Sequence, residues 1–269
     1  MREEHRELNR TWWDERVPIH TASDFYDVEA FKAGAGTLRP FELEEVGEVA
    51  GKRLLHLQCH FGLDTLSWAR RGASVVGLDF SEPAVEAANA LAGETGLDGR
   101  FVRADLYDAV GALGGERFDI VYTGLGALNW LSDLGRWGEV VTSLVAEDGV
   151  LYLAEFHPFA DVFADEELTV AHDYFHDPAG IRISNGGGTY ADLSAATVHN
   201  ATHEWAHPIS EVIGVVLANG LRLELFNEHD FTLSPRWPHL LPAEGGIYRQ
   251  PDGSPRIPLI YSLRARLPS

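Results

Sequence analysis

The stretch RLLHLQCHFGLDTLSWARRGASVVGLD, residues Arg53–Asp79, contains two short apolar runs separated by an amphipathic stretch. Periodicity predicts a strand over Arg53–Gln58, a helix over Leu63–Arg70 and a second strand over Ser74–Asp79. Two strands that are joined through a helix by short connections are normally parallel neighbours in one sheet. This stretch therefore predicts an α/β fold, which requires the same alternation of strands and helices elsewhere in the chain.

The same alternation continues on both sides of this stretch. A charged helix is predicted over residues 2–15. Downstream, the apolar runs that predict strands are Arg100–Arg103, Phe118–Thr123, Val150–Glu155, Leu221–Asn227 and Leu259–Arg266. The amphipathic stretches that predict helices are Glu82–Glu94, Leu134–Val145 and Ser210–Asn219, and Glu147-Asp148-Gly149 is predicted to be a turn. These elements predict a mostly parallel sheet with helices on both faces.

Composition excludes several classes of protein. The chain has 269 residues, of which 45% are hydrophobic and 23% charged, which is typical of a globular protein with one large domain. Its formal charge of −20 argues against nucleic acid and anionic membranes as partners. The single cysteine, Cys59, cannot form an internal disulfide or a cysteine metal cluster. No apolar stretch is long enough to cross a membrane, and Met1–Arg10 lacks the apolar core of a secretory signal, so we expect a cytoplasmic protein.

Ligands of open parallel sheets bind beyond the carboxyl ends of the strands, so the residues that follow each predicted strand are candidate ligand contacts. Gln58–Gly62 follows the first strand, and Gly62 allows a sharp turn into a helix. Asp79 ends the second strand, where a carboxylate can accept both hydrogen bonds of a ribose diol. Ser81 is the better helix cap, which would leave Asp79 free for a ligand. Asp105 and Leu106 follow the third strand and combine an acceptor with an apolar surface for a flat ring.

Together these turns resemble those of the Rossmann-like class I S-adenosylmethionine-dependent methyltransferases, over roughly residues 53–155. The resemblance implies a seven-stranded, mostly parallel sheet whose last strand is antiparallel, with S-adenosyl-L-methionine as cofactor and S-adenosyl-L-homocysteine as product. By the same resemblance, three sets of residues bind the methionine, ribose and adenine parts. They are Gln58, Cys59, His60, Gly62, Thr123 and Gly124 for methionine, Asp79 and Phe80 for ribose, and Asp105 and Leu106 for adenine.

The first turn departs from the usual pattern of this family. His56 occupies the position that is usually acidic, and Gly62 alone remains of three glycines. The HLQCHFG form is similar to that of a subgroup of small-molecule methyltransferases. His60 is open to two interpretations, as a cover for the amino-acid end of the cofactor or as a neutral core histidine, and His56 is interpreted as structural.

The segment His203-Glu204-Trp205-Ala206-His207 matches the H-E-x-x-H zinc motif, and His199 lies one helical turn earlier. Pro208 and the β-branched residues upstream disfavour a helix here, and the alternation from Thr197 to Trp205 equally fits a strand. A zinc-dependent hydrolase that uses His203, Glu204 and His207 is therefore kept as the alternative, and no metal is predicted for the favoured function.

The alternation of predicted strands and helices is interrupted between the fifth strand and the next helix. We expect residues 1–50 to form a helical, aromatic cap, residues 51–269 to form the Rossmann-like domain, and residues 157–208 to form a substrate lid inserted into that domain. A hydroxyl or ammonium acceptor must lose a proton, which a histidine can accept. The candidate bases are His157, His203 and His207. The candidate aromatic contacts to the substrate are Tyr26, Trp130, Tyr174, Tyr190 and Trp205.

The favoured function is a cytoplasmic methyltransferase that acts on a small-molecule acceptor through an N, O or C nucleophile, by in-line displacement and mainly by positioning. A small neutral or cationic acceptor suits the acidic chain, and the oligomeric state is left open. Besides the zinc hydrolase, a non-catalytic nucleotide-binding or interaction protein is kept as an alternative, because the altered first turn could have lost the cofactor. A nicotinamide dehydrogenase is weaker, since the G-x-G-x-x-G turn is missing.

Overall fold

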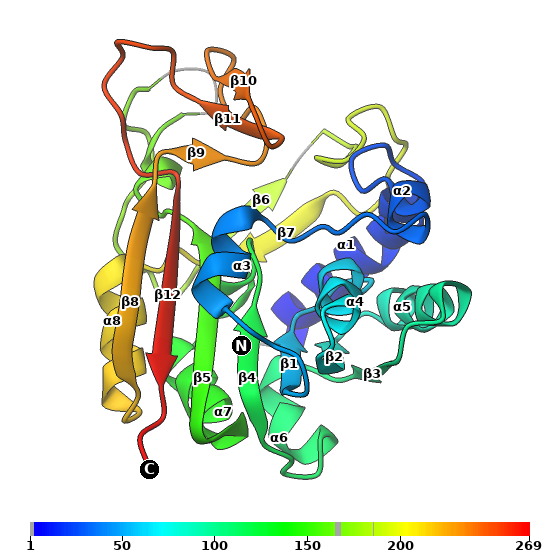
Figure 1. The fold of residues 1–269 in the computed structure, drawn as a ribbon. Coiled ribbons are helices and arrows are strands. Elements are labelled where there is room, and N and C mark those ends of the chain that lie inside the picture. The colour runs from blue at the N-terminus through cyan, green and yellow to red at the C-terminus, as the bar shows by residue number, and fades with distance from the viewer. Residues whose placement is uncertain (1–2, 165–167, 185) are drawn as a thin grey trace.

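A seven-stranded sheet forms the centre of the computed structural model, which describes residues 3–164, 168–184 and 186–269. The strand order is β3-β2-β1-β4-β5-β12-β8 (Figure 1). The five strands from β3 to β5 pair in parallel, and β12 is antiparallel to both of its neighbours. The strands are β1 Arg53–Leu57, β2 Ser74–Asp79, β3 Gly99–Arg103, β4 Phe118–Thr123, β5 Val145–Phe156, β8 Arg222–His229 and β12 Ile260–Arg266. The predicted Rossmann-like methyltransferase fold is confirmed.

Helices cover both faces of this sheet. They are α1 Glu3–Thr21, α2 Val28–Lys32, α3 Pro40–Val46, α4 Leu63–Arg70, α5 Glu82–Thr95, α6 Ala109–Ala112, α7 Leu134–Leu144 and α8 Ile209–Ala218. Short 3₁₀ turns lie at η1 Leu106–Asp108, η2 Leu128–Trp130 and η3 Ala160–Val162. Among the described helices, none has the length and apolar character that a membrane span requires.

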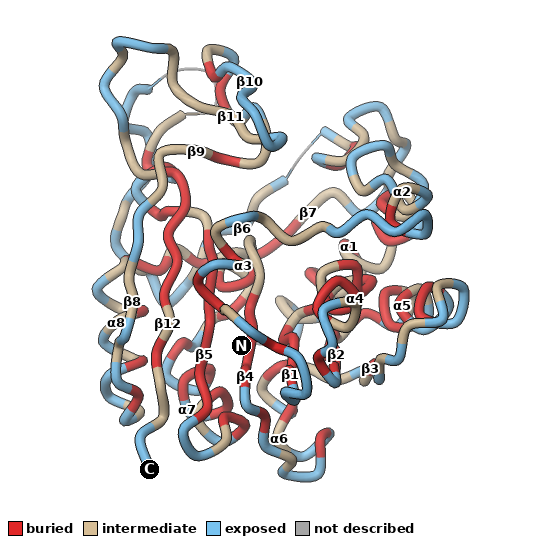
Figure 2. Tube along the Cα trace, viewed as in Figure 1, coloured by how far each residue is buried: buried red, intermediate tan, exposed pale blue. Residues whose placement is uncertain are grey.

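Two apolar cores follow from the alternation of side chains along the strands. Leu55 of β1 packs in the core that contains Trp137 of α7, whereas its neighbour Leu54 packs on the opposite face with Trp68 of α4. The central strands are buried on both faces and the edge strand β8 is only partly covered (Figure 2). The carboxyl ends of the central strands are thereby held in fixed positions, which is what a ligand site at that edge requires.

Three element predictions were wrong in detail. Helix α1 continues past Glu15 to Thr21, and Arg2 lies outside the described residues. Strand β5 already begins at Val145, because the predicted turn at Glu147-Asp148-Gly149 is an irregularity within the strand, where Asp148 has a φ of 60°. A small sheet between β8 and β12 was not predicted at all. It consists of β9 Phe231–Thr232, β10 Leu241–Ala243 and β11 Ile247–Arg249.

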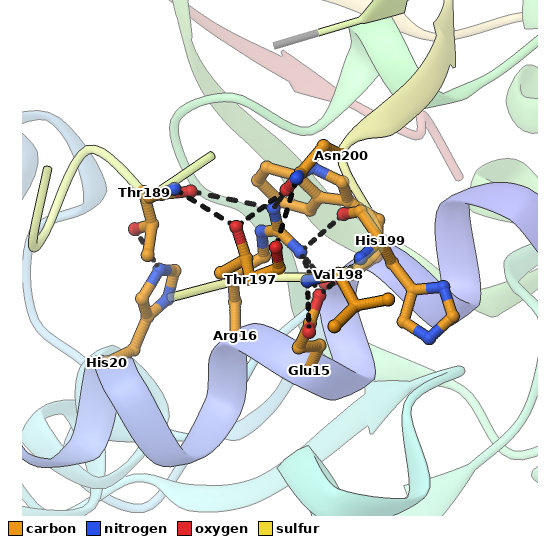
Figure 3. Close-up of polar contacts among 10 residues, drawn as sticks. Glu15, Arg16, His20, Thr189, Thr197, Val198, His199 and Asn200 are labelled. Carbon is orange, nitrogen blue, oxygen red and sulfur yellow. Dashed lines mark hydrogen bonds and ion pairs between the residues drawn. The ribbon is translucent and has the colours of Figure 1, made fainter. Parts of the chain in front are cut away.

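The segment after β5 contains the hairpin β6 Ile181–Ser184 and β7 Ala201–Glu204, and it lies against α1. Buried Arg16 donates to the carbonyl of His199 at 2.7 Å and to Oδ1 of Asn200 at 3.1 Å (Figure 3). The carboxylate of Glu15 accepts the N–H groups of Val198 and His199 at 2.7 and 2.8 Å. Helix α1 and the segment around residues 188–204 are therefore joined by polar contacts to main-chain groups.

Candidate functional site

A cleft opens at the carboxyl ends of β1 to β4, under the first helix. Its walls come from the turns after four successive strands and from one tryptophan of α1. The lining residues are Trp13, Gln58, Leu78, Asp79, Phe80, Ala104, Asp105, Leu106, Leu125, Gly126, Ala127, Trp130 and Leu131. The cleft therefore lies where ligands of open α/β sheets are expected.

Asp79 ends β2 in the wall of this cleft and is 7% exposed. Its carboxylate accepts the N–H of His60 at 2.8 Å and the N–H of Ser81 at 2.9 Å. Burial raises the pKa of Asp79 to about 6, although these two N–H groups lower it. Ser81 caps α5 as predicted, but Asp79 is not left free, because it also fixes the first turn. Each carboxylate oxygen can accept more than one hydrogen bond, so a ligand hydroxyl remains compatible with this arrangement.

Asp105 and Leu106 form the next part of the wall, after β3. The carboxylate of Asp105 accepts the N–H of Tyr107 at 2.9 Å, and its Oδ2 lies 3.7 Å from a guanidinium nitrogen of Arg6. Leu106 is buried in the core beneath. The predicted pairing of an acceptor with an apolar surface is thus present at one place in the cleft.

Gln58 is the first-turn residue that lines the cleft. Its φ is 56°, an uncommon value for a side chain other than glycine. Nε2 of Gln58 donates to the carbonyl of Ala127 at 3.0 Å, whereas its buried Oε1 has no partner among the described residues. A buried acceptor without a partner is costly, so a donor from a bound molecule would stabilise it.

The other first-turn candidates face away from the cleft lining. Cys59 is buried in the core around α4 and α5. Gly62 has a φ of 82°, and a Cβ added there would lie 2.7 Å from a ring carbon of Phe101. The glycine that remains in the altered turn is therefore required by packing under α4 as well as by the backbone conformation.

His60 takes part in a chain of polar groups that links the first turn to α1 and to the segment after β5. Its Nε2 lies 2.9 Å from Nδ1 of His20, and Nε2 of His20 lies 2.7 Å from the hydroxyl of Thr189. Burial and, to a smaller extent, the charge of Arg16 lower the pKa of His20 to about 4. Burial and the proximity of His20 hold the pKa of His60 well below its usual range. His60 therefore pairs, as a neutral imidazole, with the buried His20. Sequence reasoning missed His20.

The loop after β4 lines the cleft with Leu125, Gly126 and Ala127 and not with the predicted Thr123 and Gly124. Thr123 is fully buried at the end of the strand, and its hydroxyl has no partner within the described part of the chain. The loop is held by Glu155, whose carboxylate accepts the N–H groups of Gly126, Ala127 and Leu128 at 2.6, 2.8 and 2.9 Å. Burial raises the pKa of Glu155 to about 7.

Glu155 is the second residue that sequence reasoning missed. It ends a predicted strand, as Asp79 does, and that position was the available signal. The three loop N–H groups that it accepts are 27 to 29 residues away along the chain, so only the folded sheet brings them to Glu155, and a fourth N–H comes from the adjacent Phe156.

Two groups of aromatic side chains lie near the cleft. Trp130 lines it together with Trp13, and their ring centroids are 5.4 Å apart. Trp13 comes from the predicted aromatic cap and forms part of the cleft wall. Tyr26 and Tyr190 meet through their hydroxyl groups at 2.5 Å, and the Tyr26 ring lies 5.8 Å from that of His60.

Tyr174 and Trp205 do not line the cleft. The hydroxyl of Tyr174 accepts the N–H of Ile209 at 3.2 Å. Trp205 is 3% exposed and lies 4.8 Å from the ring of His203. The structure therefore places these two predicted substrate contacts outside the cleft.

The three candidate bases are likewise outside the cleft lining, and their ring nitrogens are engaged. His157 places Nε2 3.0 Å from a carboxylate oxygen of Glu228, while its Nδ1 accepts the N–H of Phe159 at 3.1 Å. Burial lowers the pKa of His157 in spite of Glu228. Nε2 of His203 lies 2.7 Å from the carbonyl of Ala179. The third candidate, His207, contacts Glu211 and the carbonyl of Leu131.

The H-E-x-x-H segment is not helical. Its first two residues end β7, and α8 begins only at Ile209, after Pro208. His203 and Glu204 follow each other in a strand, so they point to opposite sides. The strand interpretation holds for Ala201–Glu204 and not for the rest of the stretch from Thr197 to Trp205, and no helix forms at the motif.

Comparison with known proteins agrees with this geometry. Residues 55–151 match a family described as a methyltransferase domain. These residues form a class I S-adenosylmethionine-dependent methyltransferase domain. Over 212 residues this methyltransferase is 25% identical to a ubiquinone biosynthesis O-methyltransferase of Methylobacterium sp. (strain 4-46), covering 73% of this chain and 84% of the relative. A second ubiquinone biosynthesis O-methyltransferase, from Brucella anthropi, is 32% identical over 116 residues, which cover 43% of this chain and 42% of that protein.

Solved structures share the fold of the methyltransferase at low sequence identity. An S-adenosylmethionine-dependent methyltransferase from Mesorhizobium loti is similar with a TM-score of 0.59 and 21% identity, covering 87% of this chain and 99% of its own. The DhpI–SAH complex has a TM-score of 0.58 and 15% identity, covering 100% of this chain and 99% of its own. These two likenesses extend well beyond residues 55–151, so the fold is shared over most of the chain.

The cofactor of the methyltransferase is S-adenosyl-L-methionine, and the product is S-adenosyl-L-homocysteine. The side chains of the cleft fit this molecule, because its ammonium, ribose hydroxyls and adenine amine are donors. The cleft offers the carboxylates of Asp79 and Asp105 and the unpartnered Oε1 of Gln58 as acceptors.

Proposed function

We propose that this methyltransferase acts on a small molecule and methylates a hydroxyl group, with positioning as the main contribution to catalysis. The assignment of the cofactor site rests on one observation. Asp79, Asp105 and Gln58 present hydrogen-bond acceptors beside apolar walls in the same cleft. We assign Asp79 to the ribose, Asp105 with Leu106 to the adenine, and Gln58 to the methionine part.

When bound, S-adenosylmethionine supplies a methyl group that its sulfonium already activates. The protein must then align the acceptor with the C–S bond and exclude water. We assign the alignment to the loop at residues 125–127, which Glu155 fixes through three main-chain hydrogen bonds. We assign the exclusion of water to Trp13 and Trp130, which line the cleft.

Two observations support a small hydroxyl-bearing acceptor. The relatives with known names are O-methyltransferases of ubiquinone biosynthesis. The rings of Tyr26, Tyr190 and His60 form an aromatic group beside the first turn, which suits a flat acceptor. A net charge of −20 disfavours nucleic acid as the methylated molecule.

Base assistance by His157, His203 or His207 receives no support from their contacts, because each has a ring nitrogen engaged by a protein group and none of the three lines the cleft. We therefore propose that the acceptor gives up its hydroxyl proton to solvent water as it binds, without help from these three side chains. A phenolic hydroxyl suits such a site, because its acidity is greater than that of an alcohol.

We also propose that residues 1–50 and the insert at residues 157–208 act together as the cover of the site. Arg16, Glu15 and His20 of α1 contact residues 188–200 of the insert (Figure 3). The same helix brings Trp13 into the cleft. A cover built from both segments would move as one unit when ligands enter.

Isothermal titration with S-adenosylmethionine and S-adenosylhomocysteine tests the cofactor assignments. We expect one-to-one binding that Asp79→Asn weakens roughly ten- to a hundredfold, since a charged acceptor is lost. Asp98→Asn, at an exposed position before β3, is the matched control and should leave binding unchanged. No binding to the wild-type protein would overturn the proposed site.

The acceptor class is tested by measuring S-adenosylhomocysteine formation with matched phenols, amines and thiols. Turnover of phenols with amines inactive supports the hydroxyl assignment. Turnover of amines or thiols alone would overturn it while leaving the cofactor assignments intact.

A further inference from the structure

Three metal-ligating side chains meet beside the cleft, outside the function proposed above. They are His176 from the insert, His207 between β7 and α8, and Glu211 in the first turn of α8. The ligand atoms of the three lie within 4.8 Å of one another. His207 is buried and the other two are half-buried, so the cluster is accessible from one side.

His207 faces more hydrogen-bond acceptors than a neutral imidazole can satisfy. Its Nδ1 lies 3.1 Å from a carboxylate oxygen of Glu211, and its Nε2 lies 2.8 Å from the carbonyl of Leu131. Both partners are acceptors, whereas a neutral imidazole has only one N–H. Nδ1 of His176 lies 3.0 Å from the carbonyl of Ala206, to which a neutral imidazole can donate, and 3.9 Å from the Glu211 carboxylate, so this nitrogen would exchange its hydrogen bond to Ala206 for the ion. A cation at this point would supply the missing positive charge.

We propose that His176, His207 and Glu211 form a binding site for a divalent transition-metal ion, with Zn²⁺ as the best match. Two imidazoles and one carboxylate are a donor set that Zn²⁺ accepts in tetrahedral sites. Ligand atoms in such a site are roughly 3.3 Å apart, given zinc–nitrogen distances of about 2.0–2.1 Å. The separations of 3.1 and 3.9 Å from Glu211 to His207 and His176 are close to this value.

The surroundings of His207 orient it for this role. When its Nε2–H donates to the Leu131 carbonyl, Nδ1 carries the lone pair that points toward Glu211. Histidine ligands of metals are commonly fixed in this way by a carbonyl acceptor on the opposite ring nitrogen. Leu131 itself lines the cofactor cleft, so the ion would connect the cleft wall with α8 and the insert.

This site differs from the one that the sequence motif suggested. The motif pairs His207 with His203 and Glu204, but Nε2 of His203 contacts Ala179 and the Glu204 carboxylate accepts from Asn129 at 2.9 Å. His207 is the only residue that the motif and the structural cluster share. Because the ion would join His176 of the insert to His207 and Glu211 at the start of α8, its expected role is to hold the insert in place.

The test uses the full chain without an affinity tag, titrated with Co²⁺ and followed by the visible absorption of the bound ion, then with Zn²⁺ in competition. We expect one ion per chain, and at least tenfold weaker binding in His176→Ala and in Glu211→Gln. Both positions are half-buried, so these variants should fold, and circular dichroism checks that they do. The matched controls are His172→Ala in the insert and Glu139→Gln in α7. Both positions are exposed, and both variants should bind like wild type.

Absence of the cobalt absorption in the wild-type protein would overturn the proposal, and would leave a protonated histidine as the source of positive charge. Equal affinity in wild type and His176→Ala would overturn it as well, because the ion would then bind elsewhere. Neither readout depends on methyl transfer, so these outcomes are independent of the proposed activity.

Discussion

Nε2 of His60, in the turn after β1, lies 2.9 Å from Nδ1 of His20, near the end of α1. The turn that departs most from the family pattern is thereby attached to the helix that contributes Trp13 to the cleft wall. Neither imidazole lines the cleft itself. The altered sequence of the first turn is therefore accompanied by a contact between this turn and α1.

Acidification should weaken this attachment. The pKa of His20 is lowered to about 4 in the folded protein, below the ordinary value of 6.5. Between these values the unfolded chain binds a proton that the folded chain does not, so the contribution of His20 to stability is complete above about pH 6.5 and is lost as the pH falls toward 4. The full loss corresponds to about 3 kcal/mol.

Comparison of wild type with His20→Gln isolates this contribution from the other buried histidines. Urea unfolding at several pH values should show wild type losing stability faster than the variant as the pH falls below 6.5. His172→Gln, at an exposed position, is the control and should follow wild type. Parallel curves for wild type and His20→Gln would contradict the prediction.

Glu155→Gln should loosen the loop at residues 126–128 without unfolding the sheet. An amide offers one acceptor oxygen where the carboxylate offers two, and its NH₂ group faces N–H donors. We expect S-adenosylhomocysteine affinity to fall about tenfold, which corresponds to about 1.4 kcal/mol. Calorimetry measures the loss, and Glu147→Gln, at an exposed position of β5, is the control. Unchanged affinity would show that Glu155 has only a structural role in the fold.

Gly62→Ala should cost more stability than a positive φ alone explains. Gly62 and Gly96 have φ values of 82° and 65°, but only at Gly62 would a Cβ meet other atoms, 2.7 Å from Phe101. Gly96→Ala should therefore cost about 1–2 kcal/mol from the backbone conformation, and Gly62→Ala clearly more. Chemical denaturation compares the two variants. Partial rescue of Gly62→Ala by Phe101→Leu would identify the ring as the obstacle, and equal losses in the two single variants would refute the steric explanation.

The succession of helices and strands along the chain could be predicted from sequence because apolar runs, amphipathic stretches and strand-end acids are local patterns. Asp79 and Asp105 were found in this way, and both line the cleft. The contacts of Glu155 and His20 could not be found, since their partners are far apart in the chain and become neighbours only in the folded sheet. The small sheet from Phe231 to Arg249 was missed because its strands have only two or three residues each.

Arg16→Gln should open the contact between α1 and the insert. Arg16 is completely buried, and its guanidinium donates to the His199 carbonyl and to Asn200. A glutamine is too short to make both bonds and leaves a main-chain acceptor without its partner. Hydrogen exchange in peptides that cover Val198–Asn200 should become about tenfold faster, while exchange in β1 and β4 should stay unchanged.

Arg10→Gln is the matched control for this prediction. Arg10 lies on the same helix but pairs with Glu7 and Asp14 of α1, so its loss should not change exchange in the insert. Exchange that accelerates equally across the whole chain in Arg16→Gln would indicate global destabilisation and contradict a local contact. A local increase that bound S-adenosylhomocysteine suppresses would show that the contact and the cofactor cleft are coupled, as expected if α1 and the insert close over the site together.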